Sequence, residues 1–281
     1  DELAADALRR WGSPGLAVAV VHGGRTVVLK GYGVRALGSP DPVTPDTLFP
    51  LASCTKAFPS AVLASLVDDG KLGWDDPVRR HLPACRLSDP HADALVTLRD
   101  LLAHRTGVAG HDLLWYRAPW DLDETLRRTA RLPLAVPFRG GYEYSSTMVV
   151  AAGKAAAARA GVSWDRLVRD RLTGPLGMTA TTFTSTEAAA ASDRAAGHRR
   201  GTDGTVAPCP GYEDREPNPS GSLHATARDL VPWLTFQLAD GRLGPKRLVS
   251  ADALGETKAP HTVMRLDADL RPTYPDTAQA C

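Results

Sequence analysis

Ser53 and Lys56 are the residues whose types and spacing could do chemistry, in the tetrad Ser-Cys-Thr-Lys. A serine hydroxyl is a poor nucleophile at neutral pH and needs a neighbouring base to take its proton. A lysine one helical turn away on the same face can take that proton, or can stabilise the anion of another base. The spacing therefore permits attack on an ester or amide carbonyl, although most Ser-x-x-Lys sequences belong to solvated helix surfaces.

A helix is predicted to carry this tetrad. A helical pattern runs from about 53 to 69, and Gly70 follows where a helix would stop. Ser53 is therefore expected near the start of a helix, where backbone donors and the helix dipole favour developing negative charge. Pro59 lacks a backbone N–H, so we expect a local distortion there unless the helix begins nearer to it.

Strands and further helices are predicted on both sides of this segment. Two β-branched runs, at about 16–21 and 26–32, flank Gly23 and Gly24, which tolerate the positive φ of a tight hairpin turn. Helical spacing and composition predict further helices, which we place within 97–131, at about 146–160, within 164–178 and within 226–241. The pattern indicates a mixed chain of strands and helices without an internal repeat.

The composition limits the classes of partner. The 281 residues include 33 basic and 32 acidic side chains, a formal charge of +1, so nothing predicts capture of nucleic acid or of an anionic membrane. The longest apolar runs, such as 16–21, are far too short to span a bilayer. A small-molecule or peptide substrate is therefore expected, and localisation is left open between cytoplasmic and extracytoplasmic.

Cysteines and histidines show no spacing typical of a metal site. The four cysteines form no C-x-x-C or C-x-x-H, and the eight histidines form no H-E-x-x-H. His104 and His224 are interpreted as hydrogen-bonded structural groups. Cys54 is interpreted as a packing residue, because on a helix its side chain points about 100° away from that of Ser53. We therefore predict neither a metal nor a cofactor.

Several blocks of sequence resemble one family of enzymes. One block resembles the nucleophile helix and following loop of β-lactamase-related serine hydrolases, a family that includes class C β-lactamases, DD-carboxypeptidases and esterases. Its sequence is TLFPLASCTKAFPSAVLASLVDDGKLGWDDPVRRHLP. Later blocks resemble further parts of that family: TLRDLLAHRTGV, PFRGGYEYSSTMVVAAGKAAAARAG, GPLGMTATTF and PSGSLHATARDLVPWL. The resemblance covers nearly the whole chain.

The resemblance implies a fold and a division into lobes. The fold would be α/β (α+β) and β-lactamase/transpeptidase-like, with an antiparallel sheet flanked by helices and a helical lobe. Residues 1–281 would form one incomplete catalytic domain. Its α/β lobe would comprise 1–50 and about 223–281, and its mainly helical lobe about 51–222, with Ser53 in the cleft.

The resemblance also implies roles for four residues. Ser53 matches the nucleophile, Lys56 the helix lysine and Tyr144 the general base. A phenol with a pKa near 10 works as a base at neutral pH only if cationic neighbours hold it as phenolate. Tyr142 is a rival, ranked lower because only Tyr144 is followed by Ser-Ser. Ser146 stands where the family has asparagine, so it is expected in substrate binding with a shorter reach.

The expected function is hydrolysis of an ester, amide or β-lactam through an acyl-enzyme on Ser53. Two alternatives remain open from the sequence. One is an acyltransferase that uses the same residues, and the other is a penicillin-binding or sensor module that is acylated without turnover.

The last motif of the family, K-T-G or H-x-G on a strand that supplies the second oxyanion donor, has no match before Cys281. The one H-x-G string, His22 to Gly24, falls in the predicted hairpin turn and is interpreted as structural. An isolated two-stranded hairpin is only marginally stable. We therefore expect that the C-terminal strands are missing, and that a second chain or segment supplies them.

Overall fold

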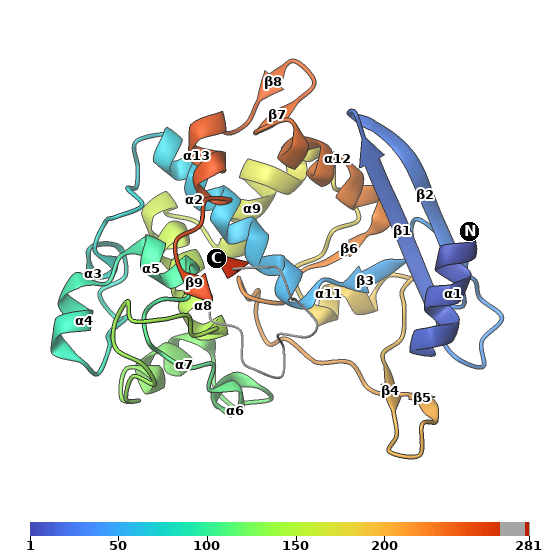
Figure 1. Cartoon of the computed structure of the whole chain (residues 1–281), viewed down its shortest axis with the longest axis horizontal. Coiled ribbons are helices and arrows are strands. Elements are labelled where there is room, and N and C mark those ends of the chain that lie inside the picture. Colours follow the sequence, from blue (N-terminus) through green and yellow to red (C-terminus); the bar gives the residue numbers. More distant parts are fainter. Residues whose placement is uncertain (265–278, 281) are drawn as a thin grey trace. The chain divides into compact units, whose positions relative to one another are not determined.

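The computed structural model describes residues 1–264 and the backbone of 279–280 (Figure 1). The chain divides into two compact units, each built from separate segments. The first unit comprises Asp1–Cys54, Arg169–Asn218 and Ser222–Leu248. The second comprises Thr55–Val168, Pro219–Gly221 and Val249–Cys281.

A β-hairpin forms the largest sheet of the first unit. Strands β1 (Gly15–His22) and β2 (Arg25–Gly33) pair antiparallel, with a register shift between Val20 and Val21. Gly23 and Gly24 have φ of 55° and 73°, as a tight turn with two positive φ values requires. The predicted hairpin is confirmed, and the His22–Gly24 string leads into its turn.

Helix α12 (Ala227–Leu238) covers this hairpin within the first unit and contacts both of its strands (Figure 1). The Thr226 side chain caps the helix by accepting a hydrogen bond from the Asp229 N–H. Just before it, β6 (His224–Thr226) pairs with β3 (Leu48–Pro50), the strand that leads toward Ser53. The rest of the unit consists of short elements: α1 (Glu2–Trp11), the π-helical turn η2 (Arg169–Thr173), α10 (Gly174–Leu176), α11 (Ser185–Ala189), β4 (His198–Arg200), β5 (Val206–Pro208), β7 (Arg242–Leu243) and β8 (Lys246–Arg247).

Two helices that are apolar on all sides form the centre of the second unit. Helix α2 (Ala57–Asp68) buries an almost unbroken run from Phe58 to Leu66, and α8 (Ser146–Ala160) buries nearly every residue of its first three turns. A helix that is apolar all round must be covered by neighbours. Those neighbours include α3 (Val78–His81), α5 (Leu98–Leu102), α7 (Leu122–Thr129), α9 (Trp164–Val168) and α13 (Ala251–Glu256). The unit also contains α4 (Pro90–Leu95) and α6 (Asp112–Trp115), of which α6 packs on α7. Short strands β9 (Val263–Met264) and β10 (Gln279–Ala280) also pair in this unit.

The helix predicted from about 53 to 69 has two parts. A 3₁₀ turn, η1, spans Ala52–Lys56, and the α-helix α2 follows from Ala57. Pro59 is thus the third residue of α2, in the first turn of an α-helix, where backbone N–H groups have no partner within the helix. The α-helix therefore begins near Pro59, which is the alternative to a distortion that the sequence left open.

The compact units divide the chain differently from the predicted lobes at 51–54, at 169–218 and after 248, and the lobe division itself stays a prediction. Residues 169–218, predicted in the helical lobe, belong to the first unit, where Thr182 bridges to His224 and Arg194 to Leu48. Residues from 249 onward belong to the second unit, where α13 packs on α2. The predicted division followed the type of secondary structure, whereas the units follow packing. Part of the predicted C-terminal lobe, 265–278 and 281, lies outside the described residues.

Among the described residues, strands pair as five two-stranded antiparallel sheets. No described helix is long and apolar enough to cross a membrane.

Candidate active site

The tetrad predicted from sequence lies on the short helix η1. Just before it, the Leu51 N–H donates a 2.8 Å hydrogen bond to the carbonyl oxygen of Leu223. Ala52 adopts a φ of 44°, an uncommon value for a residue with a side chain, and Ser53 follows it on the surface. In a 3₁₀ helix, residues three apart eclipse one another. Ser53 and Lys56 therefore share one face of η1 more closely than they would in an α-helix.

Lys56 is held by two groups of the second unit. Its Nζ donates a 2.9 Å hydrogen bond to the main-chain oxygen of Ser220. The same Nζ lies 4.8 Å from the centroid of the Tyr144 ring, within the range of a cation–π contact. The side chain is half-buried. The ammonium is therefore fixed between a carbonyl dipole and an aromatic face.

The Ser220 carbonyl can approach Lys56 because α8 has a glycine, Gly153, at the point where Pro219 packs against it. A Cβ added at Gly153 would lie 2.5 Å from both Cβ and Cγ of Pro219, a distance that real side chains do not tolerate. The missing side chain thus lets the segment Pro219–Gly221 rest directly on α8. Ser220 itself is 4% exposed, so its carbonyl is presented to Lys56 in a largely dry environment.

Tyr144 stands immediately before α8 and is 40% exposed. The main chain on both sides of it is bound to one histidine. The Glu143 N–H donates to the His104 carbonyl at 2.8 Å, and the Ser145 N–H donates to His104 Nδ1 at 3.1 Å. The position of Tyr144 therefore depends on His104 more directly than on the helix that follows.

His104 is buried, and its backbone has a φ of 53°. Its ring lies 4.6 Å from that of Tyr144 at an angle of 35°, and 5.5 Å from that of Tyr142 edge-on. Burial, helped by the nearby Lys56 charge, lowers the pKa of His104 to about 4. The imidazole is therefore neutral at physiological pH.

The buried carboxylate of Asp100 binds the two segments that carry His104 and Tyr144. Asp100 has a fully buried side chain and accepts hydrogen bonds from Arg105 (2.5 Å) and Arg139 (2.7 Å). It also completes a capping box with Thr97 at the start of α5. Arg105 follows His104, and Arg139 precedes the tyrosines. This network therefore ties together the two segments that carry His104 and Tyr144.

The other sequence-predicted residues lie close to this cluster in the chain. Ser146 begins α8 and is 5% exposed, which leaves little of its side chain to meet a substrate. Its role in substrate binding stays a prediction. Tyr142, the rival tyrosine, is half-buried against the edge of the His104 ring, whereas Lys56 lies over Tyr144.

Sequence reasoning did not identify three of the groups that define this cluster. His104 was interpreted as structural, and neither Ser220 nor Gly153 was singled out. The position of His104 in the family-like block TLRDLLAHRTGV was the available signal for it. No local pattern predicts the bond between Lys56 and Ser220, because these residues are 164 positions apart.

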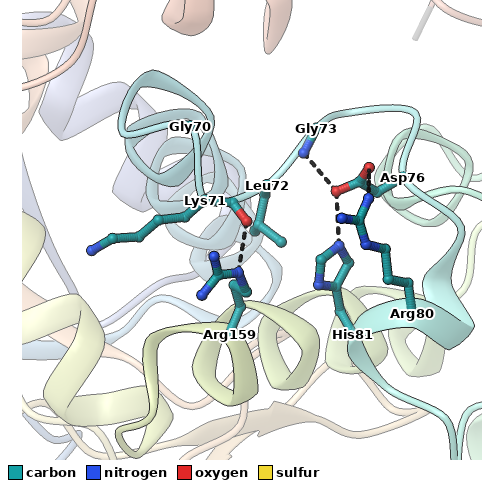
Figure 2. A pocket seen from close by; sticks show the side chains of 8 residues that line it. All are labelled: Gly70, Lys71, Leu72, Gly73, Asp76, Arg80, His81 and Arg159. Atoms are coloured by element: carbon teal, nitrogen blue, oxygen red, sulfur yellow. Dashed lines mark hydrogen bonds and ion pairs between the residues drawn. The ribbon is translucent and has the colours of Figure 1, made fainter.

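A separate cavity of about 550 Å³ opens elsewhere on the second unit (Figure 2). Its charged groups bind one another: Asp76 accepts hydrogen bonds from the Gly73 N–H, His81 and Arg80, and Arg159 donates to the Lys71 carbonyl. None of the predicted site residues lines it. The cavity is framed by turns that these bonds stabilise, and we assign no function to it. In the part of the chain that the structure describes, no group of His, Cys, Asp and Glu side chains could hold a metal ion.

Comparisons with known proteins identify the family of this chain. The model of the β-lactamase family matches residues 1–275. An unguisins hydrolase from Aspergillus campestris is 35% identical over 254 residues, which cover 84% of this chain and 46% of that protein. Penicillin-binding protein 4 of Amycolatopsis lactamdurans is 32% identical over 231 residues, or 81% of this chain and 60% of that protein. The chain thus spans about half the length of these relatives.

A solved structure shows the same fold. The D-amino acid amidase from Ochrobactrum anthropi SV3, complexed with L-phenylalanine amide, is 26% identical and superposes with a TM-score of 0.73, over 95% of this chain and 74% of that one. The chain belongs to the β-lactamase family of serine hydrolases and penicillin-binding proteins, and its fold is the β-lactamase/transpeptidase-like fold that the sequence predicted.

Proposed function

We propose that this chain forms an acyl-enzyme on Ser53 and hydrolyses an ester, amide or β-lactam bond. The observation that carries the proposal is the placement of Lys56. Its ammonium is bound to the Ser220 carbonyl and lies over the Tyr144 ring, while η1 places Ser53 one 3₁₀ turn away on the same face. Acyl transfer through serine requires a nucleophile and an adjacent group that activates it, and Lys56 and Tyr144 are the candidates for that group here.

Each residue has a distinct part in the proposed reaction. Tyr144 takes the proton of the Ser53 hydroxyl, and the Lys56 ammonium stabilises the negative charge that develops as the proton moves. The Ser53 oxygen bonds to the substrate carbonyl carbon, and the leaving group departs with the proton that Tyr144 received. Water then enters, Tyr144 takes one of its protons, and the water oxygen bonds to the acyl carbon. The ester bond to Ser53 breaks, Tyr144 returns the proton to the Ser53 oxygen, and the acid is released.

The family relatives support the class of reaction. The protein with 35% identity is named as a hydrolase, and the structure with 26% identity is an amidase bound to an amide. The first name states hydrolysis and the second cleavage of an amide, which supports hydrolysis of a small-molecule or peptide substrate by this chain.

The proposal includes a further segment of protein on the first unit. Within the described residues, the β1–β2 hairpin pairs only with itself, and none of its side chains is fully buried. Val20 and Val27 are 42% and 57% exposed. An additional strand from the same chain or from a partner would pair with this hairpin and cover such side chains.

The decisive experiment is intact-mass analysis of the 281-residue chain after incubation with a fluorophosphonate and with penicillin. We expect one covalent adduct, absent in Ser53→Ala and present in Ser13→Ala, which removes an exposed serine of the first unit. Labelling that survives Ser53→Ala would contradict the proposal, as would a wild-type chain that stays unlabelled even when the additional strand is supplied.

The fate of the adduct separates the alternatives that the sequence left open. Release to water with recovery of unmodified protein indicates a hydrolase. Faster release when an amine or alcohol is added indicates acyl transfer. A penicillin adduct that persists indicates a binding or sensor module.

A further inference from the structure

We propose that His104 is a positioning residue for Tyr144: as a neutral imidazole protonated on Nε2, it holds the Tyr144 ring over Lys56 without adding a second positive charge there. This inference rests on the proposed function, because Tyr144 and Lys56 are the residues that it serves. Nothing in the sequence assigned His104 this role.

The tautomer of His104 follows from one hydrogen bond. The Ser145 main-chain N–H can only donate, and it donates to His104 Nδ1 at 3.1 Å. Nδ1 must therefore carry the lone pair, and the proton of the neutral ring is on Nε2. Because Ser145 is fully buried, its N–H has no water to bond to if this acceptor is lost.

The ring of His104 supports Tyr144 on one side, and Lys56 lies over the same tyrosine ring. The centroids of His104 and Tyr144 are 4.6 Å apart, and Lys56 Nζ is 4.8 Å from the Tyr144 centroid. Tyr142 closes the edge of the imidazole at 5.5 Å. Tyr144 is 40% exposed, so without the imidazole its ring would have freedom to turn away from Lys56.

The charge of the His104 ring matters because Lys56 already supplies a positive charge near it. The titratable groups in contact with the ring are Tyr142 and Tyr144, and Lys56 is the cation that acts on it. A protonated imidazole would repel the Lys56 ammonium and would lose the Ser145 hydrogen bond. Burial and Lys56 both disfavour that charged form, and they lower the pKa of His104 to about 4.

Two substitutions test separately the contributions of the His104 ring and of its Nδ1 acceptor. His104→Asn keeps an oxygen that can accept from Ser145 and tolerates the φ of 53°, but removes the ring. His104→Phe keeps a ring and removes the acceptor, at a backbone position that bulky residues disfavour. His91→Asn is the matched control, because His91 contacts only the edge of Phe138 among the described rings.

The first readout does not depend on activity. Proton NMR should show a nuclear Overhauser effect between the Lys56 side-chain methylenes and the Tyr144 ring in the wild-type chain, in His91→Asn and in folded His104→Phe, but not in His104→Asn. Nitrogen-15 NMR of the wild type should show His104 with a bare Nδ1 and a protonated Nε2 from about pH 5 to 9. An imidazole that titrates within this range, or an unchanged Overhauser effect in His104→Asn, would overturn the proposal.

The second readout is acylation of Ser53 by p-nitrophenyl acetate. We expect His104→Asn to slow acylation by about 10- to 100-fold with little change in KM, because misplacing a catalytic group affects the reaction more than binding. His104→Phe should melt at a lower temperature but retain acylation per folded molecule. Loss of activity that follows only the loss of folded protein in both variants would show a purely structural role. If the wild type does not react even with the additional strand supplied, the proposed function fails, while the NMR comparison still decides the role of His104.

Discussion

Lys56 donates a hydrogen bond of 2.9 Å to the main-chain oxygen of Ser220, a residue 164 positions later in the chain. This bond fixes a flexible side chain to a rigid acceptor. It also leaves the ammonium over Tyr144, at the end of the short helix that bears Ser53. Substitutions of Lys56, Tyr144, Gly153 and Asp100 test the groups that hold this arrangement.

Lys56→Met should slow acylation of Ser53 by about 10²- to 10⁴-fold, the range typical of losing a group that assists proton transfer. Methionine keeps the length of the side chain but has no charge with which to stabilise the negative charge that develops as the proton moves. The rate of fluorophosphonate labelling measures the effect. Lys71→Met is the control, because Lys71 pairs with Asp69 beyond the end of α2 and should leave the rate unchanged. Equal rates for both variants would rule out a role for Lys56.

Tyr144→Phe should lower kcat by at least about 10²-fold with a much smaller change in KM, because only the hydroxyl that accepts the proton is removed. Tyr142→Phe should stay close to the wild-type rate, since its contact with His104 is made by the ring. Steady-state hydrolysis of p-nitrophenyl acetate by the two variants distinguishes them. The opposite order of rates would identify Tyr142 as the base.

Gly153→Ala should destabilise the protein by about 1–3 kcal/mol and slow acylation as well. The new Cβ would meet Pro219 at 2.5 Å, and the shift that relieves this clash moves the Ser220 carbonyl away from Lys56. Gly255→Ala in α13 is the matched control, because its Cβ would enter open space and alanine favours a helix. Urea unfolding and labelling rate are measured for both. A slowed Gly255→Ala would show that the effect is not specific to Pro219.

Asp100→Asn should cost about 3–5 kcal/mol at pH 7, because Arg105 and Arg139 would lose their buried partner. Burial of Asp100 works to raise its pKa, but hydrogen bonds from Arg139, Thr97 and Arg105 outweigh it and hold the pKa below the usual value.

A carboxylate with a lowered pKa stabilises the fold at pH values above the ordinary carboxyl pKa of about 4, and this stabilisation is lost as the pH falls further. The difference in unfolding free energy between wild type and Asp100→Asn should therefore shrink in acid. Urea titrations at neutral pH and at about pH 3 measure it. A difference that stays constant would contradict the role assigned to the ion pairs.

Local elements of this fold could be predicted from the sequence because short-range forces determine them. Gly23 and Gly24 allow the positive φ of a hairpin turn, and the alanine-rich segment 146–160 forms the helix expected of it. The pairing of Ser53 with Lys56 on one helical face likewise depends only on their spacing of three. These features need no contact with a distant part of the chain.

The remaining parts of the candidate site depend on tertiary packing. Residues 169–218 and those from 249 onward join units that their secondary structure did not indicate, because burial of apolar faces decided their partners. Ser220 meets Lys56 only because Gly153 lets Pro219 approach α8, and His104 meets Tyr144 only because the Ser145 N–H binds Nδ1. The sequence by itself determined which residues could act as nucleophile and cation. The tertiary structure decided what holds the cation in place, because such contacts depend on surfaces that come together only on folding.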